Sequence, residues 1–182
     1  MWAHSKYPAE AQPDIVTMAK PLANGIPIGA ILVRDEVVKV VTVGSHGTTF
    51  GGNVLCTRLA HHVLQRLSTP TFVSELESTS AYLSTLLNRL PTLFPELIPA
   101  PPRGRGLILG IPFSNTTMPG RFVELCRERG VLLLTAGTDC VRVLPSLNVT
   151  KAECEKAVAV MESVGEVMIE EGWTKDGKVH VP

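Results

Sequence analysis

Lys20 is the residue of this sequence whose surroundings best suit covalent chemistry. It follows an apolar stretch, residues 15–19, and precedes a turn rich in proline and glycine that runs to Gly29. This pattern predicts a short buried strand that delivers an amine to the edge of a cavity. An ε-amine held there would lose hydration, and its neutral form can attack a carbonyl carbon. An ordinary strand-end lysine that points into water fits the same local pattern.

The segment from Gly44 to Asn53 offers a different chemistry, the binding of an anion. Its glycines let the backbone approach a ligand closely, while Thr48 and Thr49 supply hydroxyl and amide donors. Asn53 is predicted to begin a helix, whose first amides also favour an anion. Considered in isolation, the same residues fit a plain turn that leads into a helix.

Arg142 is the third candidate, because it follows an apolar run and shortly precedes Pro145. We expect its guanidinium at a strand end near a turn, where a planar fork suits a bidentate hold on a carboxylate. A surface arginine is the alternative. Two further arginines, Arg103 and Arg105, are interpreted as structural or solvent-facing.

No spacing typical of a metal site or a disulfide framework is present. The four cysteines, at positions 56, 126, 140 and 154, lack any Cys-x-x-Cys spacing. They are interpreted as reduced thiols of an intracellular protein. His61 and His62 are adjacent in a predicted helix, where neighbouring positions face different ways. We therefore expect no bound metal.

The elements that must position these residues alternate between strands and helices, which predicts an α/β fold. Hydrophobic periodicity predicts the following elements in the first half: strands over residues 15–19, 30–33 and 37–43, and helices over residues 53–67 and 71–90. Prolines between residues 91 and 102 interrupt regular structure and indicate a connection to a smaller domain.

In the second half, the predicted elements are strands over residues 106–113, 131–135 and 140–144, and helices over residues 119–129 and 150–170. Thr150 and Glu153 have the spacing of a capping box at the last helix. The predicted domains are residues 1–90 and 91–172, followed by a loose tail, residues 173–182.

Composition excludes several classes of partner. The 182 residues are 45% hydrophobic and carry a formal net charge of zero, so no electrostatic footprint indicates nucleic acid or an anionic membrane. No apolar run approaches the roughly 20 residues that a membrane span needs. The first residues resemble neither a signal peptide nor an arginine-rich presequence. We expect neither nucleic acid nor membrane as a partner.

Four blocks of the sequence, in the same order, resemble the class III aminotransferases, which are fold type I pyridoxal-phosphate enzymes. The blocks are Thr17–Ala30, Gly44–Asn53, Arg103–Ile111 and Val141–Leu147. Within this family the resemblance is strongest to the fungal acetylornithine aminotransferases, through residues 19–25 and 129–137. It implies the end of the large pyridoxal-phosphate-binding domain followed by the small C-terminal α/β domain.

The resemblance also implies roles for individual residues. Lys20 would carry pyridoxal 5'-phosphate as the internal aldimine and would then act as general base and acid. Thr49 would bind the cofactor phosphate, and Thr48 would contact both cofactor and substrate. Arg142 would hold a substrate carboxylate. The family's glycine- and threonine-rich loop reaches into the partner subunit, so a homodimer is expected.

The reaction implied is the transfer of an amino group from N-acetylornithine to 2-oxoglutarate in arginine biosynthesis, with small amino and oxo acids as partners. Ornithine, 4-aminobutyrate or succinylornithine as amino donor is one alternative. A second is an inactive fragment that acts only as an interaction partner. The family segment with the aspartate that pairs with the pyridine nitrogen has no counterpart here, so a truncated form is expected. The resemblance therefore does not extend to the activity of this chain alone. The mitochondrial matrix is expected for a full-length fungal-type parent, while the absence of a presequence leaves the cytoplasm open for this chain.

Overall fold

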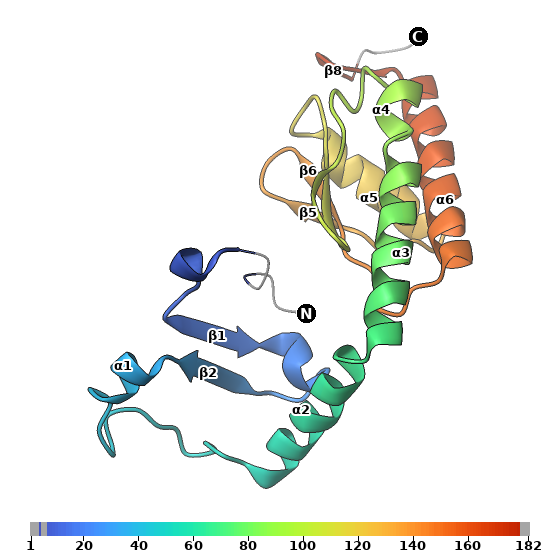
Figure 1. The fold of residues 1–182 in the computed structure, drawn as a ribbon. Coiled ribbons are helices and arrows are strands. Elements are labelled where there is room, and N and C mark those ends of the chain that lie inside the picture. Colours follow the sequence, from blue (N-terminus) through green and yellow to red (C-terminus); the bar gives the residue numbers. More distant parts are fainter. Residues whose placement is uncertain (1–3, 5–6, 179–182) are drawn as a thin grey trace. The chain divides into compact units, whose positions relative to one another are not determined.

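The chain forms two compact units in a computed structural model that describes residue 4 and residues 7–178 (Figure 1). The first unit is Met1–Val73 and the second is Ser74–Pro182. This division lies inside helix α3 (Pro70–Leu87), whereas the domain boundary was expected after residue 90. The helix continues past the division because Leu83 and Leu87 are buried in the core of the second unit.

The first unit contains a two-stranded antiparallel sheet and one long helix. Its elements are η2 (Ala9–Ala11), β1 (Ile15–Ala19), η3 (Lys20–Ala23), β2 (Gly29–Val33), α1 (Asp35–Val38) and α2 (Val54–Leu67). Strands β1 and β2 pair with Ile15 opposite Val33 and Ala19 opposite Gly29. The first two predicted strands and the predicted helix over residues 53–67 are thereby confirmed.

The prediction of a third strand over residues 37–43 is wrong. Asp35 and Glu36 occupy the first turn of helix α1, where negative charge favours a helix start. Turns follow, and Val40 and Val43 are exposed. Valine favours a strand only where a neighbouring strand packs against it, and the described part of the chain supplies none here.

The first unit has a small core. Its buried hydrophobic residues are Leu22, Ala23 and Ala60, so η3 packs on α2. Strand β1 alternates between exposed and half-buried positions, and the prediction of a buried strand before Lys20 is therefore wrong. The reason is that β2 is the only strand paired with β1 among the described residues.

The second unit is built on a four-stranded antiparallel sheet in the order β3-β4-β6-β5. Its elements are α3, α4 (Leu90–Leu93), β3 (Arg103–Arg105), β4 (Ile108–Pro112), α5 (Met118–Glu128), β5 (Leu134–Ala136), β6 (Cys140–Val143), α6 (Lys151–Glu170), β7 (Trp173–Thr174) and β8 (Gly177–Lys178). The strands and helices predicted here are confirmed, but the strand predicted over residues 131–135 begins three residues later, as β5. Strand β3 was not predicted.

One face of this sheet carries a continuous core. Alternate residues of the two central strands are buried on it: Leu109, Ile111, Val141 and Val143. Helix α5 contacts β5, β6 and α6, and its Phe122 is fully buried against the ring of Phe113. Helices α3 and α6 run side by side in the same direction in Figure 1. The Tyr82 hydroxyl of α3 donates a hydrogen bond to Glu155 of α6, and Arg89, just after α3, forms an ion pair with Glu162.

Local signals determine where α6 begins. The Thr150 hydroxyl accepts a hydrogen bond from the Glu153 amide at 3.2 Å, and the Glu153 carboxylate accepts one from the Thr150 amide at 2.8 Å. The predicted capping box is therefore confirmed. The hydrogen bonds that the Thr150 amide and hydroxyl donate to the Glu153 carboxylate lower the pKa of Glu153, because they favour the charged carboxylate.

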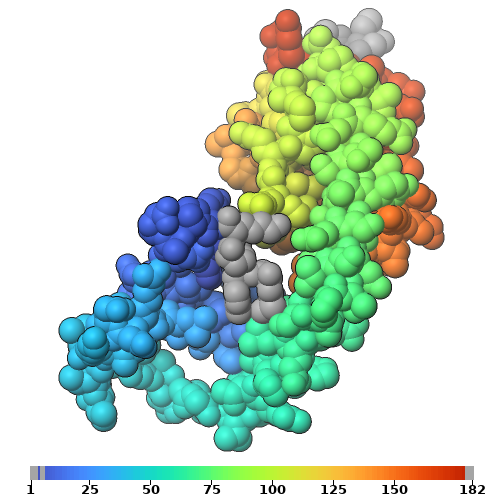
Figure 2. All heavy atoms as spheres, in the orientation of Figure 1, coloured from blue at the N-terminus to red at the C-terminus, as the bar shows by residue number. Residues whose placement is uncertain are grey.

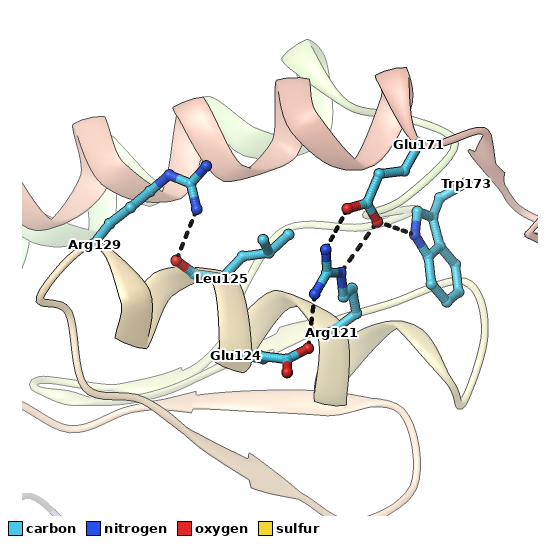
Figure 3. A network of polar contacts seen from close by, with 6 residues as sticks. All are labelled: Arg121, Glu124, Leu125, Arg129, Glu171 and Trp173. Atoms are coloured by element: carbon cyan, nitrogen blue, oxygen red, sulfur yellow. Dashed lines mark hydrogen bonds and ion pairs between the residues drawn. The ribbon is translucent and has the colours of Figure 1, made fainter.

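Residues 173–178, expected to be loose, form the short hairpin of β7 and β8; residues 179–182 of that predicted tail lie outside the described residues. Figure 3 shows how the end of α6 is tied to α5. Arg121 donates to Glu171 with two nitrogens and to Glu124 at 2.8 Å, while Trp173 Nε1 donates to Glu171 at 3.1 Å. The hydrogen bonds from Arg121 lower the pKa of Glu171 to about 2.

Neither a membrane span nor a metal cluster occurs among the residues that the structure describes. None of their helices is both long and apolar enough to cross a bilayer. No three of their histidine, cysteine, aspartate or glutamate side chains gather where a metal ion could be held. All four cysteines are free thiols, and burial raises the pKa of Cys126 to about 12, which makes it a poor nucleophile.

Candidate active site

Lys20 has an unusual backbone conformation. It follows β1 as the first residue of η3 and has a φ of 50°, in the left-handed region. Among the described residues, only Asn24 shares a positive φ without being glycine. Such a conformation costs a non-glycine residue about 1–2 kcal/mol, so the surrounding structure must enforce it. Buried Leu22 and Ala23, packed on α2, supply that constraint.

The side chain of Lys20 is exposed. It has no hydrogen bond or salt bridge within the described part of the chain, so its amine is free to react. Burial at a cavity edge, on which the predicted loss of hydration depended, is not observed. That Lys20 is the reactive residue stays a prediction, which depends on its position and backbone geometry rather than on desolvation.

The glycine- and threonine-rich loop lies at the surface, cyan in Figure 2, and Thr48 and Thr49 are both exposed. Its internal bonds run from the Gly51 amide to the Thr48 carbonyl at 3.0 Å and from the Asn53 amide to the Phe50 carbonyl at 3.2 Å. No such bond uses the amides of Thr48 and Thr49 within the described residues. The loop therefore presents free amides beside two hydroxyl groups.

Glycine suits position 51, because a Cβ atom there would lie close to the Thr48 carbonyl oxygen, at 3.2 Å. Gly52 has a φ of 71°, which other residues rarely adopt. These two positions keep the loop tight and its backbone accessible. A phosphate or carboxylate is the kind of group that free amides and hydroxyls at such a bend can bind.

The start of helix α2 contributes less to anion binding than predicted. Asn53 Oδ1 accepts hydrogen bonds from the amides of Leu55 and Cys56, each at 3.1 Å. Asn53 is thus the N-cap, as expected from the sequence, but its side chain satisfies amides that an anion would otherwise use. The donors for an anion are those of the loop itself.

A cavity of about 890 Å³ lies within the first unit between the β1–β2 hairpin and the loop. Its wall includes Met18, Ile28, His46, Thr48, Phe50 and Asn53. Neither Lys20 nor Thr49 lines it. The structure therefore places Thr48 on the wall of the same cavity as the hairpin, but it does not gather Lys20, Thr48 and Thr49 around a single cavity.

Arg142 lies in β6, in the second unit, between buried Val141 and Val143. Its position is inside the strand, not at the predicted strand end. The residue is exposed and stands opposite Gly110 on β4 and Leu134 on β5. Since Val141 and Val143 face the core, the guanidinium projects from the other, open face of the sheet.

Sequence reasoning missed β3 and with it the position of Arg103. The run Arg103–Arg105 contains glycine and no β-branched or aromatic residue, so it gives no strand signal of its own. Its pairing with β4, Arg103 opposite Gly110, defines the strand. The alternation of the two arginines about Gly104 was the one available sign that both share a face.

The available groups suit two ends of pyridoxal phosphate. The free primary amine of Lys20 matches an aldehyde, and the loop amides with the hydroxyls of Thr48 and Thr49 match a phosphate. These residues fit the cofactor by their chemistry and their accessibility.

Comparisons with known proteins agree with this chemistry. The family described as Aminotransferase class-III matches residues 1–164. The mitochondrial acetylornithine aminotransferase of Neurospora crassa is 42% identical over 168 residues, which cover 92% of this chain and 36% of that protein. The protein of the same name from Debaryomyces hansenii is 39% identical over 162 residues, covering 89% and 34%. The chain thus spans little more than a third of the length of these curated relatives.

Solved structures give the same likeness. The N-acetylornithine aminotransferase from Stenotrophomonas maltophilia K279a aligns with a TM-score of 0.78 at 29% identity, covering 93% of this chain and 43% of that one. The ornithine aminotransferase from Toxoplasma gondii also gives 0.78, at 30% identity, covering 87% and 38%. Pyridoxal phosphate partially occupies the active site of that Toxoplasma structure.

Proposed function

This chain belongs to the class III aminotransferase family, and on that premise we propose that it serves in amino-group transfer with pyridoxal 5'-phosphate as the cofactor. The observation that carries the proposal is Lys20. A free amine, held by a strained left-handed backbone at the end of β1, occupies the position that the resemblance gives to the cofactor lysine. Strain of this kind concentrates at functional sites.

When bound, the cofactor supplies an electron sink for bond changes at the carbon that bears the amino group. The protein residues provide attachment, orientation and proton transfer. Lys20 Nζ would hold the cofactor through its aldehyde carbon. Once a substrate amine has released Lys20, the same nitrogen would move a proton at the substrate carbon.

The family resemblance assigns the remaining contacts to the glycine- and threonine-rich loop and to Arg142. The hydroxyls of Thr49 and Thr48, with their free amides, would bind the phosphate, and Thr48 would also contact the substrate. The planar guanidinium of Arg142 would hold a substrate carboxylate with two parallel hydrogen bonds.

A homodimer is part of the proposal. Thr48 lines a cavity that excludes Lys20 within the same unit. This supports an arrangement in which the loop of one copy completes the site of Lys20 in a second copy, as the family resemblance implies.

The proposed substrates are N-acetylornithine as amino donor and 2-oxoglutarate as acceptor, in arginine biosynthesis. Their support is the name shared by the fungal relatives, which also suggests the mitochondrial matrix as the compartment. Ornithine is the second candidate donor, because an ornithine aminotransferase aligns with an equal TM-score.

Glutamate formation tests the proposal in a chimera in which this chain replaces the matched 168-residue segment of the Neurospora crassa relative. With pyridoxal phosphate, 2-oxoglutarate and N-acetylornithine, we expect the chimera to form glutamate, and to do so faster than with ornithine. Lys20→Ala should lower the rate by about 10³-fold, because it removes the proton-transferring amine.

The matched control is Lys39→Ala, since Lys39 is an exposed lysine of the same unit that lies just after α1. It should leave the rate unchanged. Glutamate formation that survives Lys20→Ala, or an inactive unsubstituted chimera, would contradict the proposal.

A further inference from the structure

We propose that Ala60 of helix α2 is a positioning residue for the amine of Lys20, because its small side chain lets η3 pack on the helix and so keeps the Lys20 backbone in its left-handed conformation. This assignment rests on the amino transfer proposed above and deepens it, since it identifies what holds the proposed cofactor lysine in place. All the residues concerned lie in the first unit.

The backbone of Lys20 would change its conformation if nothing held it. A φ of 50° is unfavourable for a residue that has a Cβ atom. Pro21 follows directly, and a proline ring favours an extended conformation at the residue before it. Because η3 begins at Lys20, relaxation of this residue would swing η3 away from its present position. The conformation of Lys20 and the position of η3 are therefore set together.

The contact between η3 and α2 opposes this relaxation. Leu22 and Ala23 of η3 are only 8% and 4% exposed, and they form one buried cluster with Ala60. In Figure 1, η3 is the short coil after the arrow of β1, next to α2. Moving η3 would return the apolar surface of Leu22 and Ala23 to water, which is unfavourable. Burial of this cluster thus offsets the strain at Lys20.

Ala60 is the residue of α2 on which the cluster depends. It is buried, whereas the other positions of the helix are exposed or half-buried. Half-buried Leu59, Val63 and Leu64 surround it at helical spacing, so this side of α2 faces the rest of the unit. A larger side chain in a filled contact forces its neighbours to shift. At position 60, the neighbour that would shift is η3.

The same helix also holds the end of the glycine- and threonine-rich loop. Asn53 Oδ1 accepts hydrogen bonds from the amides of Leu55 and Cys56, each at 3.1 Å, and Ala60 lies about two turns farther along. Helix α2 thus joins the end of the loop to the support of Lys20. The two capped amides report whether a substitution at position 60 disturbs the start of the helix as well.

The first experiment changes the size of residue 60 in the purified chain, without cofactor. The one-bond Cα–Hα coupling of Lys20, measured by NMR, distinguishes a positive from a negative φ. Ala60→Leu enlarges the side chain and keeps a high helix propensity. It should shift this coupling to the value for a negative φ. Protection of the Leu55 and Cys56 amides from exchange should not change, because the cap is intact.

His61→Leu is the matched control, since His61 is the next residue of α2 and is exposed. The same new side chain should there leave Lys20 unchanged. A double variant, Leu22→Ala with Ala60→Leu, exchanges the two side chains and conserves their combined volume. It should restore the positive φ of Lys20, because the two substitutions compensate each other only where the residues share one contact.

The second experiment measures the chemical consequence in the Neurospora crassa chimera. Displacement of a reacting group by about 1 Å can lower a rate by about 10²-fold. Ala60→Leu should therefore lower kcat for glutamate formation by about 10²-fold. It should leave the KM for N-acetylornithine nearly unchanged, because the loss concerns the step at Lys20 and not substrate binding. His61→Leu should change neither constant, and the double variant should recover kcat.

Three results would overturn the assignment: an unchanged Lys20 coupling in Ala60→Leu, an equal change in His61→Leu, or a double variant that behaves like Ala60→Leu. Loss of protection at Leu55 and Cys56 without recovery in the double variant would show a general packing role for Ala60 and would also contradict the assignment. Because the coupling is measured without cofactor, an inactive unsubstituted chimera bears on the proposed amino transfer alone.

Discussion

The two units of this chain differ in how much of their structure is buried. The second unit has a continuous core that extends from Leu83 to Met168, between the buried faces of its helices and one face of its sheet. Among the described residues of the first unit, the buried ones are Leu22, Ala23 and Ala60, and side chains as large as Phe50 are exposed. Lys20 and the glycine- and threonine-rich loop lie in the thinly packed unit. The comparison teaches that the proposed cofactor lysine and the main source of stability are separated along the chain.

Deleting one phenyl ring in each unit gives the largest expected contrast. Phe122 is fully buried and Phe50 is 80% exposed. Phe122→Ala should destabilise the second unit by about 4 kcal/mol, because it leaves a cavity in a filled core. Phe50→Ala should cost less than about 0.5 kcal/mol. Amide hydrogen exchange in α5 and in α2 measures the two effects, and similar losses would erase the contrast between the units.

Two helical glycines sharpen the comparison within the second unit. A Cβ atom on Gly165 of α6 would lie 2.6–2.8 Å from the ring of Phe94, whereas nothing lies within 4 Å of such an atom on Gly120 of α5. Gly165→Ala should therefore cost about 2 kcal/mol by overpacking. Gly120→Ala should stabilise its helix by about 0.5 kcal/mol. Chemical denaturation gives both values; a neutral Gly165→Ala would mean that the core is looser than its burial indicates.

Acid should weaken the second unit through Glu171. Hydrogen bonds from Arg121 lower the pKa of Glu171 from 4.5 to about 2 in the folded chain. A carboxyl whose pKa is lowered by folding stabilises the fold above its unfolded pKa, and the contribution disappears as the pH falls through the folded value. The stability is thus lost between about pH 4.5 and pH 2.

Both side chains of this pair are partly exposed, so the contribution should be about 1 kcal/mol at neutral pH. Glu171→Gln should remove it and flatten the dependence of stability on pH in that window. Glu170→Gln, one residue earlier and exposed at the end of α6, is the control and should leave the acid dependence in place. Thermal unfolding as a function of pH measures this dependence. The same acid dependence in Glu171→Gln and Glu170→Gln would contradict the stabilising role of Glu171.

Local sequence patterns predicted the parts of this fold that depend on neighbouring residues. The helical stripes, the capping box of Thr150 and Glu153, and the cap at Asn53 are such features. Residues 37–43 were mistaken for a strand because a valine-rich run favours a strand only where a partner strand exists. Strand β3 was missed for the opposite reason, since pairing with β4 creates it from residues that lack strand propensity.

The candidate site stays a prediction in its residues, and its geometry could not be predicted. Residue types left an ordinary alternative open for each of Lys20, Thr48, Thr49 and Arg142, and the family resemblance assigned their roles. The positive φ of Lys20 depends on how η3 packs, and the place of Arg142 inside β6, opposite Gly110, depends on strand pairing. Both follow from contacts between distant residues, which no local pattern contains.

The most direct test of the central claim is to determine which lysine binds pyridoxal phosphate. The purified chain is mixed with the cofactor, its absorbance is recorded, and borohydride reduction is followed by peptide mapping. We expect a band at about 410–430 nm, a general property of the lysine-bound cofactor, and label on Lys20 with none on exposed Lys39. Absence of the band, or label spread over many lysines, would contradict the assignment of Lys20 as the cofactor lysine.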